Sequence, residues 1–396
     1  MGMAQQKTIK NIIYNLKFLK NKKVQLFLRV VLVLIIFFNL VSVVFGQREK
    51  YFSYDYNKNY PSLEKIYYDS IYKNKHGNWV PDEILYSYIS GALVRGKSPI
   101  LLNPEVPPFG TYIIGVSTIL FNNQSIVIIF FAIISLFLMY LLGRQIYDKE
   151  IFALLPPTLL SFEPIFKNQL IYTPLLDIIQ LTFLLLIFYF FNKSLREKKN
   201  FIKYVILTNI FFGFFISTKF FGTGITIIFA ILVPLFIHKE WKRLKWFLIT
   251  MPIAVFILYA NYLKVLIDGY PFSRFLGIQK WIFLYNKGHL REPFSIWPLL
   301  LLNRWYLTFG SKRISSDPQW LISWPIVTIV SFSAMLFAYI KKIYRKEVEV
   351  MFFWVIAYCL LMSFADASAR YFVILVPILY MVSLYGIIEF VKVIRK

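Results

Sequence analysis

Residue types that build disulfide frameworks, metal centres and hydrated surfaces are scarce in this sequence. Its 396 residues include one cysteine, Cys359, and three scattered histidines. A single cysteine excludes an intramolecular disulfide and a thiolate cluster, and the histidines lack the spacing of a zinc site. Charged residues make up 16% of the chain, whereas a soluble domain carries about 25%. These shortages exclude an ordinary soluble fold and a disulfide-rich secreted domain.

Apolar side chains dominate the rest of the sequence. Hydrophobic residues account for 58% of the chain and aromatic residues for 19%. A disordered chain does not contain so much apolar surface, and a soluble fold cannot bury it. The sequence therefore predicts an all-α polytopic membrane protein of about ten transmembrane helices. The ten apolar runs are 24–45, 125–142, 151–162, 174–191, 204–217, 220–237, 246–266, 320–340, 350–364 and 371–391.

The distribution of basic residues predicts the orientation of these helices. The net charge of +24 comes from 44 Lys and Arg against 20 Asp and Glu. Basic residues collect in short alternate connections such as 193–203 and 239–245, and the positive-inside rule places such connections, with both termini, in the cytoplasm. Their attraction to anionic lipid explains the charge without nucleic acid. Two long segments of more balanced charge are then extracytoplasmic, and we expect the working surface on that side.

This orientation gives an expected organisation for the chain as a single membrane domain. After Pro81, residues 82–95 alternate as an amphipathic helix with Ile84, Leu85 and Tyr88 on one face, which predicts a helix in the membrane interface. A second short helix is predicted after Pro107-Pro108. The expected parts of the domain 1–396 are a first span 24–45, a first loop 46–124 with the interfacial helices, membrane helices 125–266, a second loop 267–319 and C-terminal spans 320–391.

A nucleotide-binding motif within the first loop is predicted to be fortuitous. The stretch from Gly91 to Ser98 has the spacing G-x-x-x-x-G-K-S. A phosphate-binding loop of this type needs a buried strand before it and a helix that begins at the lysine. Here an amphipathic helix is predicted before the second glycine, and Pro99 follows the motif.

Acidic and basic residues at predicted helix ends are the candidates for chemistry. Asp82 and Glu83 begin the interfacial helix, where the helix dipole favours an ionised carboxylate. They could take a proton from a hydroxyl group, or they could simply cap the helix. Asp177, Lys219 and Arg370 lie at the outer ends of three spans. The alternative for Asp177 is an interfacial side chain without a function, and the alternative for Lys219 is a side chain that snorkels to the interface. Cations and carboxylates converging on one side would suit a phosphate-bearing lipid.

The order of these features resembles the GT-C glycosyltransferases, specifically the protein O-mannosyltransferase and aminoarabinose transferase superfamily. The resemblance rests on the outer Asp-Glu pair, the Pro-Pro step in Val106-Pro-Pro-Phe-Gly-Thr111 and the later Gly213-Phe-Phe-Ile-Ser-Thr-Lys219-Phe-Phe-Gly222 segment. The stretch from Gln279 to His289, followed by a Trp-Pro pair at Trp297, is similar to an outer loop of the mannosyltransferases. Val106 and Thr111 stand where that family has histidine and lysine, which leaves the sugar and the acceptor open.

The resemblance implies a membrane glycosyltransferase that takes a sugar from a polyprenyl or dolichyl phosphate. It implies Asp82 as the base for the acceptor hydroxyl, which belongs to a protein Ser or Thr or to a glycolipid, with Glu83 orienting the acceptor or Asp82. Lys219 and Arg370 would hold the donor phosphate, and Asp177 would orient the sugar or a cation. His289 and Trp297 would belong to a loop that contacts donor or acceptor. A single displacement would invert the anomeric centre.

Two questions remain open at the level of sequence. Asp82, Glu83 and Asp177 could together hold a divalent cation, although the mannosyltransferase resemblance favours action without metal. A transporter or flippase of lipid-linked sugars would share the many spans and the charged helix ends. Transporters often contain internal repeats and broken midplane helices, which this sequence lacks.

Overall fold

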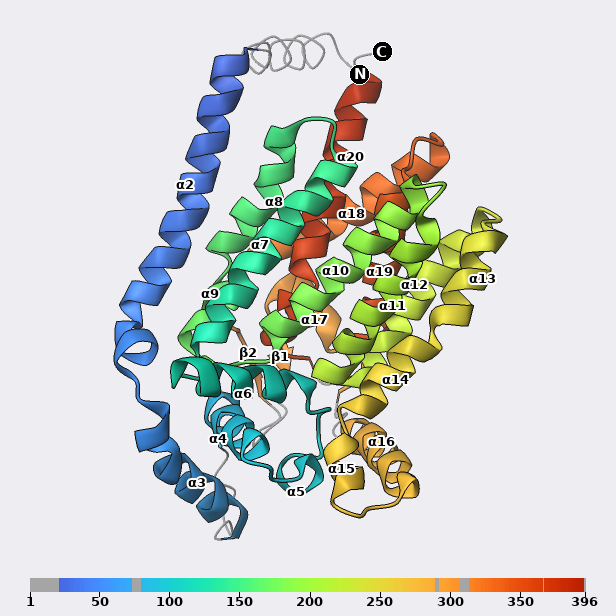
Figure 1. Ribbon diagram of the computed structural model, residues 1–396. Coiled ribbons are helices and arrows are strands. Elements are labelled where there is room, and N and C mark those ends of the chain that lie inside the picture. Colours follow the sequence, from blue (N-terminus) through green and yellow to red (C-terminus); the bar gives the residue numbers. More distant parts are fainter. Residues whose placement is uncertain (1–20, 73–79, 289–291, 307–312, 366, 395–396) are drawn as a thin grey trace.

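A computed structural model describes residues 21–72, 80–288, 292–306, 313–365 and 367–394. These residues form a bundle of long helices capped at one end by short helices that run across it (Figure 1). Helix α2 begins and helix α20 ends at the opposite end of the bundle, which also carries the short basic connections. Among the described residues, the only strands are the two-residue pair β1 (Trp305–Tyr306) and β2 (Ile314–Ser315). The predicted all-α membrane fold is confirmed.

Within the described residues, seven helical segments are long and apolar enough to cross a membrane, and each of the ten predicted apolar runs contains a helix. The run 246–266 differs from the prediction because Pro252 cannot donate a backbone hydrogen bond and starts a new helix there. The seven are α2 (Lys22–Gly46), α7 (Ile126–Ile146), α10 (Asp177–Arg196), α11 (Phe201–Thr218), the pair α13 (Trp241–Thr250) and α14 (Pro252–Ala260), α18 (Ser323–Ile340) and α20 (Val376–Ile394). The shorter runs are α8 (Glu150–Phe162), α12 (Gly224–Ile237) and α19 (Lys346–Met362).

Helix α10 forms the centre of the bundle, and α2 lies at its edge. The apolar window of α10 is 72% buried, whereas that of α2 is 0% buried. A helix that is apolar on all sides is buried or faces lipid, and these two helices show the two outcomes. Helix α2 packs against α8 and α9 (Pro164–Ile171). The Asn39 amide anchors it there by donating to the Ser161 hydroxyl oxygen at 2.9 Å.

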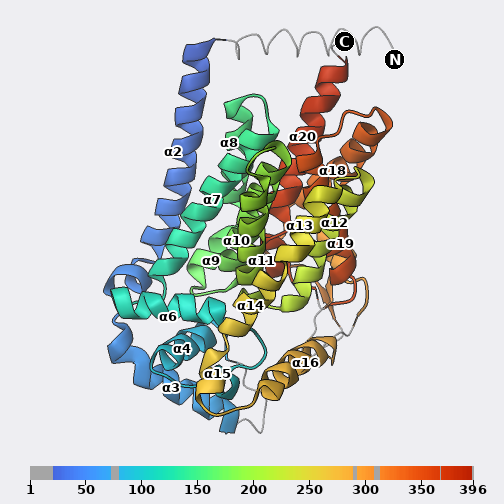
Figure 2. The same cartoon turned by 45° about the vertical axis from the view of Figure 1, so that its right-hand side comes forward.

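The two long segments of balanced charge supply the short helices at the far end of the bundle (Figures 1 and 2). The first contributes α3 (Tyr56–Tyr72), α4 (Asp82–Val94), α5 (Pro99–Leu102) and α6 (Phe109–Phe121). The second contributes α16 (Phe272–Gly288) there and α17 (Ile296–Leu302) beside α18. The short helix α15 (Leu263–Ile267), at the end of the predicted run 246–266, lies with α16. The prediction of a short helix after Pro107-Pro108 is confirmed by α6, which is long enough to cover the base of α7 and α11.

Helix α4 begins at Asp82 as predicted, but the expectation of one apolar face was wrong. Residues Tyr86–Leu93 are all buried because α4 is packed between α3 and α6. The glycine at position 91 is required by close packing, since a side chain there would overlap the Tyr56 hydroxyl group. Gly96 ends the helix with a positive φ of 88°, a conformation that favours glycine. The nucleotide-binding motif is therefore a helix end, preceded by α4 and not by a strand.

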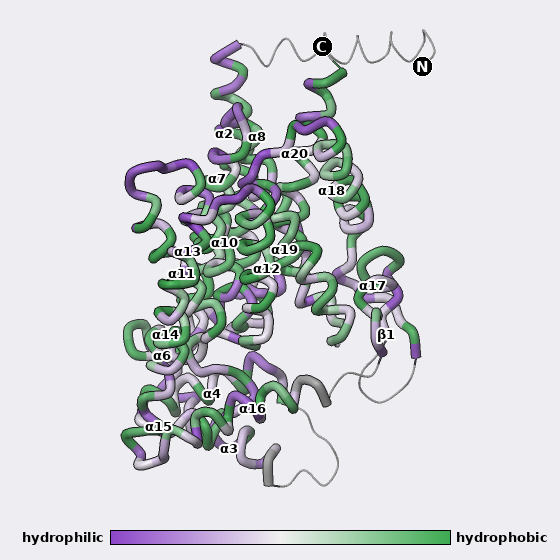
Figure 3. Tube along the Cα trace, turned by 90° about the vertical axis from the view of Figure 1, so that its right-hand side faces the viewer, coloured by the Kyte–Doolittle hydropathy of each residue, from purple (hydrophilic) through white to green (hydrophobic). Residues whose placement is uncertain are grey.

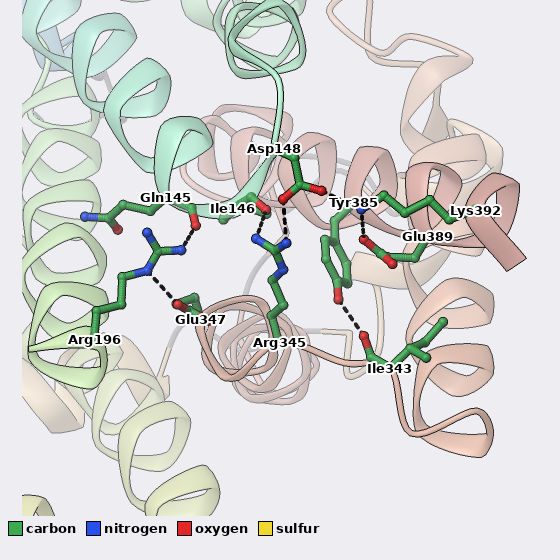
Figure 4. A network of polar contacts seen from close by, with 10 residues as sticks. All are labelled: Gln145, Ile146, Asp148, Arg196, Ile343, Arg345, Glu347, Tyr385, Glu389 and Lys392. Carbon is green, nitrogen blue, oxygen red and sulfur yellow. Dashed lines mark hydrogen bonds and ion pairs between the residues drawn. The ribbon is translucent and has the colours of Figure 1, made fainter.

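Hydrophilic residues collect at the end of the bundle that carries the termini (Figure 3). There the α7–α8 turn is tied to two other helices through Asp148, whose carboxylate contacts Arg345 at 2.6 Å and Lys392 at 2.7 Å (Figure 4). Nearby, Arg196 contacts Glu347 at 2.7 Å. These contacts join the ends of α7, α10, α19 and α20.

Candidate active site

Four of the sequence-predicted charged residues meet in one cluster beside the short helices. Arg370 lies between two carboxylates, with its Nη2 atom 2.7 Å from Asp82 Oδ2 and its Nε atom 3.2 Å from Asp177 Oδ2. The Lys219 ammonium group is ion-paired to the other oxygen of Asp177. The cluster therefore has two carboxylates and two cations, which come from four elements far apart in the sequence.

Helix ends place all four side chains. Asp82 is the first residue of α4 and Asp177 is the first residue of α10, so both carboxylates lie at the positive end of a helix dipole. Lys219 directly follows the last residue of α11. Arg370 lies in a 3₁₀ turn, Ala369–Val373, which packs against α9, α10 and α20. Because helix ends are fixed by the bundle, the charges are held on rigid elements.

The cluster changes from buried to accessible along its length. The Asp177 side chain is 3% exposed and that of Lys219 is 14% exposed, whereas the Asp82 side chain is 34% exposed. Burial lowers the pKa of Lys219, and the neighbouring Asp177 carboxylate only partly opposes this effect. Asp82 is thus the acid that a ligand from outside can reach, and Asp177 is the acid that holds both cations in place.

Aromatic side chains line the same cluster, and the sequence did not point to them. The Lys219 nitrogen lies 4.5 Å from the centre of the Tyr371 ring, and the Arg370 guanidinium carbon lies 5.7 Å from it. Such cation–π contacts favour the charged forms of both residues. Tyr86 follows Asp82 by one helical turn and is buried beside Asp82 and Arg370. The position of Tyr371 next to Arg370 was the available sequence signal.

A further carboxylate, Glu105, lies close to this cluster. It is hydrogen-bonded to the hydroxyl group of Tyr285 on α16. Burial, the Glu105 carboxylate and the Asp82 carboxylate together raise the pKa of Tyr285. Tyr285 is therefore close to both acids, and it brings α16 to the cluster. The sequence signal for Glu105 was its position directly before Val106-Pro-Pro.

The remaining predicted site residues have different positions. Glu83 lies in the first turn of α4, half-buried, and its carboxylate forms no ion pair with the described part of the chain. Trp297 on α17 donates its indole N–H to the Ser363 hydroxyl oxygen at 2.9 Å. No hydrogen bond links Trp297 to the four charges within the residues that the structure describes. His289 lies outside the described residues.

The donor set around the cluster is better suited to an anion than to a metal ion. Within the described ranges, no three side chains among His, Cys, Asp and Glu gather as a metal-binding group. The oxygens of Asp82 and Asp177 instead face Arg370 and Lys219. Two cations next to the partly exposed Asp82 can contact phosphate oxygens, and the guanidinium group of an arginine matches two of them at once.

Comparison with known proteins identifies the fold family. Residues 105–263 match the family model of dolichyl-phosphate-mannose-protein mannosyltransferases. The structure is similar to that of ArnT from Cupriavidus metallidurans bound to undecaprenyl phosphate, with 13% identity, a TM-score of 0.56, and coverage of 83% of this chain and 59% of that chain. The chain has the GT-C fold. The predicted resemblance to the GT-C glycosyltransferase superfamily is thereby confirmed.

Other GT-C structures show the same likeness. The apo form of that ArnT has a TM-score of 0.54 at 12% identity, with coverage of 83% of this chain and 58% of that chain. The archaeal oligosaccharyltransferase AglB from Archaeoglobus fulgidus, in complex with an inhibitory peptide and a dolichol-phosphate, has a TM-score of 0.50 at 13% identity, with coverage of 87% and 51%. The chain thus spans between half and three fifths of the length of these GT-C proteins. No curated protein matches it in sequence.

Proposed function

We propose that this GT-C chain is a glycosyltransferase that moves a sugar from a polyprenyl or dolichyl phosphate to an acceptor hydroxyl group. The observation that carries the proposal is the cluster in which Arg370 joins an accessible carboxylate, Asp82, to a buried one, Asp177, beside Lys219. Two GT-C proteins of similar fold are described in complex with undecaprenyl phosphate and dolichol-phosphate. A lipid phosphate therefore suits the two cations of this cluster.

In the proposed reaction, Asp82 takes the proton from the acceptor hydroxyl group while the acceptor oxygen bonds to the anomeric carbon. The bond between that carbon and the phosphate oxygen breaks, and its electron pair leaves with the lipid phosphate. One such displacement inverts the anomeric centre. Phosphate leaves as a stable anion, so the acid that glycosidases need for their leaving group is not required. Glu83, in the same helical turn as Asp82, would orient the acceptor.

Arg370 and Lys219 would stabilise the leaving phosphate. Negative charge develops there in the transition state, and fixed cations act most strongly where charge develops. Arg370 already contacts Asp82, so a donor phosphate that binds the guanidinium group competes with that carboxylate. Donor binding therefore weakens the pairing of Asp82 and leaves it a better proton acceptor.

We further propose that this site faces the extracytoplasmic side. The support is the accumulation of Lys and Arg at the other end of the bundle. Cysteine substitution tests this directly, because the native Cys359 is buried and does not interfere. In intact cells, Asn59→Cys on α3 should react with a membrane-impermeant maleimide, whereas Lys198→Cys should react only after permeabilisation. The reverse pattern would place the cluster in the cytoplasm.

The activity itself can be tested by comparing cells with and without the protein. Mass spectrometry of their polyprenyl-phosphate sugars and of their glycosylated proteins and lipids should show an accumulated donor and a missing product. Cells that express the Asp82→Asn chain should match the cells without the protein. Loss of the donor from one leaflet, with no change in glycosylated products at either side, would instead indicate a transporter or flippase.

A further inference from the structure

A groove follows the short helices next to the proposed site. One cavity of about 360 Å³ is lined by Tyr68, Lys97, Asp268 and Tyr270 among others. A second, of about 730 Å³, is lined by residues that include Tyr270, Pro104 and Trp281. Both volumes fall within the roughly 300–1,000 Å³ typical of ligand pockets. Tyr270 lines both cavities, so the two hollows adjoin between α5 and the segment α15–α16, and together they are called the groove.

One end of this groove lies next to Tyr285. The ring of Trp281 stacks on that of Tyr285 with 4.9 Å between the ring centres. Tyr285 is hydrogen-bonded to Glu105, which directly follows the groove residue Pro104. Tyr285 is also close enough to Asp82 for that carboxylate to affect it. A molecule bound along the groove therefore has one end next to Tyr285 and Glu105, on the side of the proposed base.

The lining of the groove is both aromatic and charged. Its aromatic rings are contributed by Tyr68, Tyr270 and Trp281, and the Trp281 side chain is 41% exposed. Its charged groups include the Lys97 ammonium, which is also bonded to Glu64 at 2.7 Å, and the Asp268 carboxylate. A third, Arg274, has its guanidinium carbon 5.9 Å from the centre of the Tyr270 ring. The groove lining thus contains both hydrogen-bonding groups and flat aromatic faces.

This pattern fits a saccharide chain better than a peptide or an acyl chain. A pyranose ring has an apolar C–H face that packs on an aromatic ring, and its rim of hydroxyl groups both donates and accepts hydrogen bonds. A peptide bound as an added strand would need an open strand edge, and the described strands, β1 and β2, are absent from the groove lining. An acyl chain would leave Lys97, Asp268 and Arg274 without hydration.

We infer that this groove binds the saccharide part of the acceptor and presents its terminal hydroxyl group to Asp82. The inference rests on the proposed function, and it narrows the acceptor to a molecule that already carries a saccharide of several units. Trp281 and Tyr270 are the aromatic platforms, and Trp281 is the platform next to the reacting end.

The test uses the full-length protein in nanodiscs with two probes. Binding of tetrasaccharides of the malto, cello and chito series is followed by saturation-transfer difference NMR, and binding of undecaprenyl phosphate by native mass spectrometry. Wild-type protein should bind at least one tetrasaccharide, and Trp281→Ala and Tyr270→Ala should weaken its binding by about tenfold or more. Both variants should bind undecaprenyl phosphate as wild type does. Leu276→Ala is the matched control, because Leu276 is an exposed residue of α16 outside the groove lining.

Three results would overturn the inference. The groove is not a saccharide site if none of the tetrasaccharides binds the wild-type protein, or if they bind Trp281→Ala with unchanged affinity. A Ser/Thr-rich peptide that binds wild type but not Trp281→Ala, with no saccharide binding, would assign the groove to a protein acceptor. Failure of the wild-type protein to bind undecaprenyl phosphate is a separate result, which counts against the proposed function and not against the groove.

Discussion

Replacing Asp82 with asparagine should separate catalysis from folding. The Asp82 side chain is 34% exposed and its only described ion pair is the 2.7 Å contact with Arg370. Accessible ion pairs of this kind contribute about 0–1 kcal/mol to stability. Asparagine has the same shape and can still accept a hydrogen bond from Arg370, so the loss in folding free energy should stay within about 1 kcal/mol.

The expected loss of activity is much larger than this loss of stability. A positioned general base contributes about 10²–10⁴-fold to the rate, and asparagine cannot accept the proton. Transfer should therefore slow by about 10²-fold or more, which corresponds to about 2.7 kcal/mol or more in activation free energy. Because Asp82 acts only after the donor has bound, the fall should appear in kcat, with donor affinity nearly unchanged or slightly higher.

The assay is transfer of radiolabelled sugar from a lipid-linked donor in membrane vesicles of cells that lack the native protein. Glu83→Gln is the matched control, since it removes a carboxylate from the same helical turn. It should slow transfer less than Asp82→Asn if Glu83 only orients the acceptor. A normal rate for Asp82→Asn would refute the assignment of the base. Glu105 would then be the acid to examine, because it lies beside the same tyrosine, Tyr285.

Four further substitutions probe the two cations and the ion pairs around Asp148 at the other end of the bundle. Arg370→Gln and Lys219→Gln should each weaken binding of undecaprenyl phosphate by about tenfold or more, because a hydrogen bond to a charged group contributes about 1.5–3 kcal/mol. An unchanged Kd in both variants would show that neither residue holds the phosphate. Burial lowers the pKa of Lys219, and the ammonium group is charged only below that pKa. Donor affinity should therefore fall as the pH rises, and this decline should begin at a lower pH than an exposed lysine would give. Lys219→Arg should remove the decline. Asp148→Asn should lower the unfolding temperature in detergent by a few degrees at most, since Asp148 is largely exposed. Binding of undecaprenyl phosphate should be unchanged. A large fall in the unfolding temperature or in the binding affinity would contradict the expectation that these exposed ion pairs contribute little.

The helices could be predicted from the sequence because lipid-facing and core-facing residues are both apolar. A continuous apolar run predicts a membrane helix whether it faces lipid, as in α2, or the centre of the bundle, as in α10. The burial of α4 could not be predicted in this way. It depends on the approach of Tyr56 from α3 and on the small residue Gly115 of α6, where a side chain would overlap Val94 and Ser90. Close packing of this kind depends on partners far away in the sequence.

The charged cluster was predictable as a set of candidates but not as a geometry. Asp82, Asp177, Lys219 and Arg370 were recognisable one by one, because charged groups at the ends of membrane helices are unfavourable unless they are paired or functional. Their pairing depends on the turn Ala369–Val373, which follows α19 and places Arg370 between the two acids. No local pattern in the sequence specifies that position.

The composition of the cluster fits the charge movement of the proposed reaction. Its two carboxylates and two cations balance, which avoids the desolvation of an unpaired buried charge. A sugar on a lipid phosphate is a phosphodiester with one negative charge, and the lipid phosphate that leaves carries close to two at neutral pH, because the second pKa of a phosphomonoester is about 6. The proton taken by Asp82 compensates for this increase, so the total charge of the site stays constant while one negative charge moves from the carboxylate to the phosphate. Arg370 can interact with the negative charge at both positions. Its guanidinium group contacts Asp82 before the reaction, and together with Lys219 it would contact the leaving phosphate. A lysine in its place would provide a single point of charge, and this is the physical reason for an arginine at the centre of the cluster.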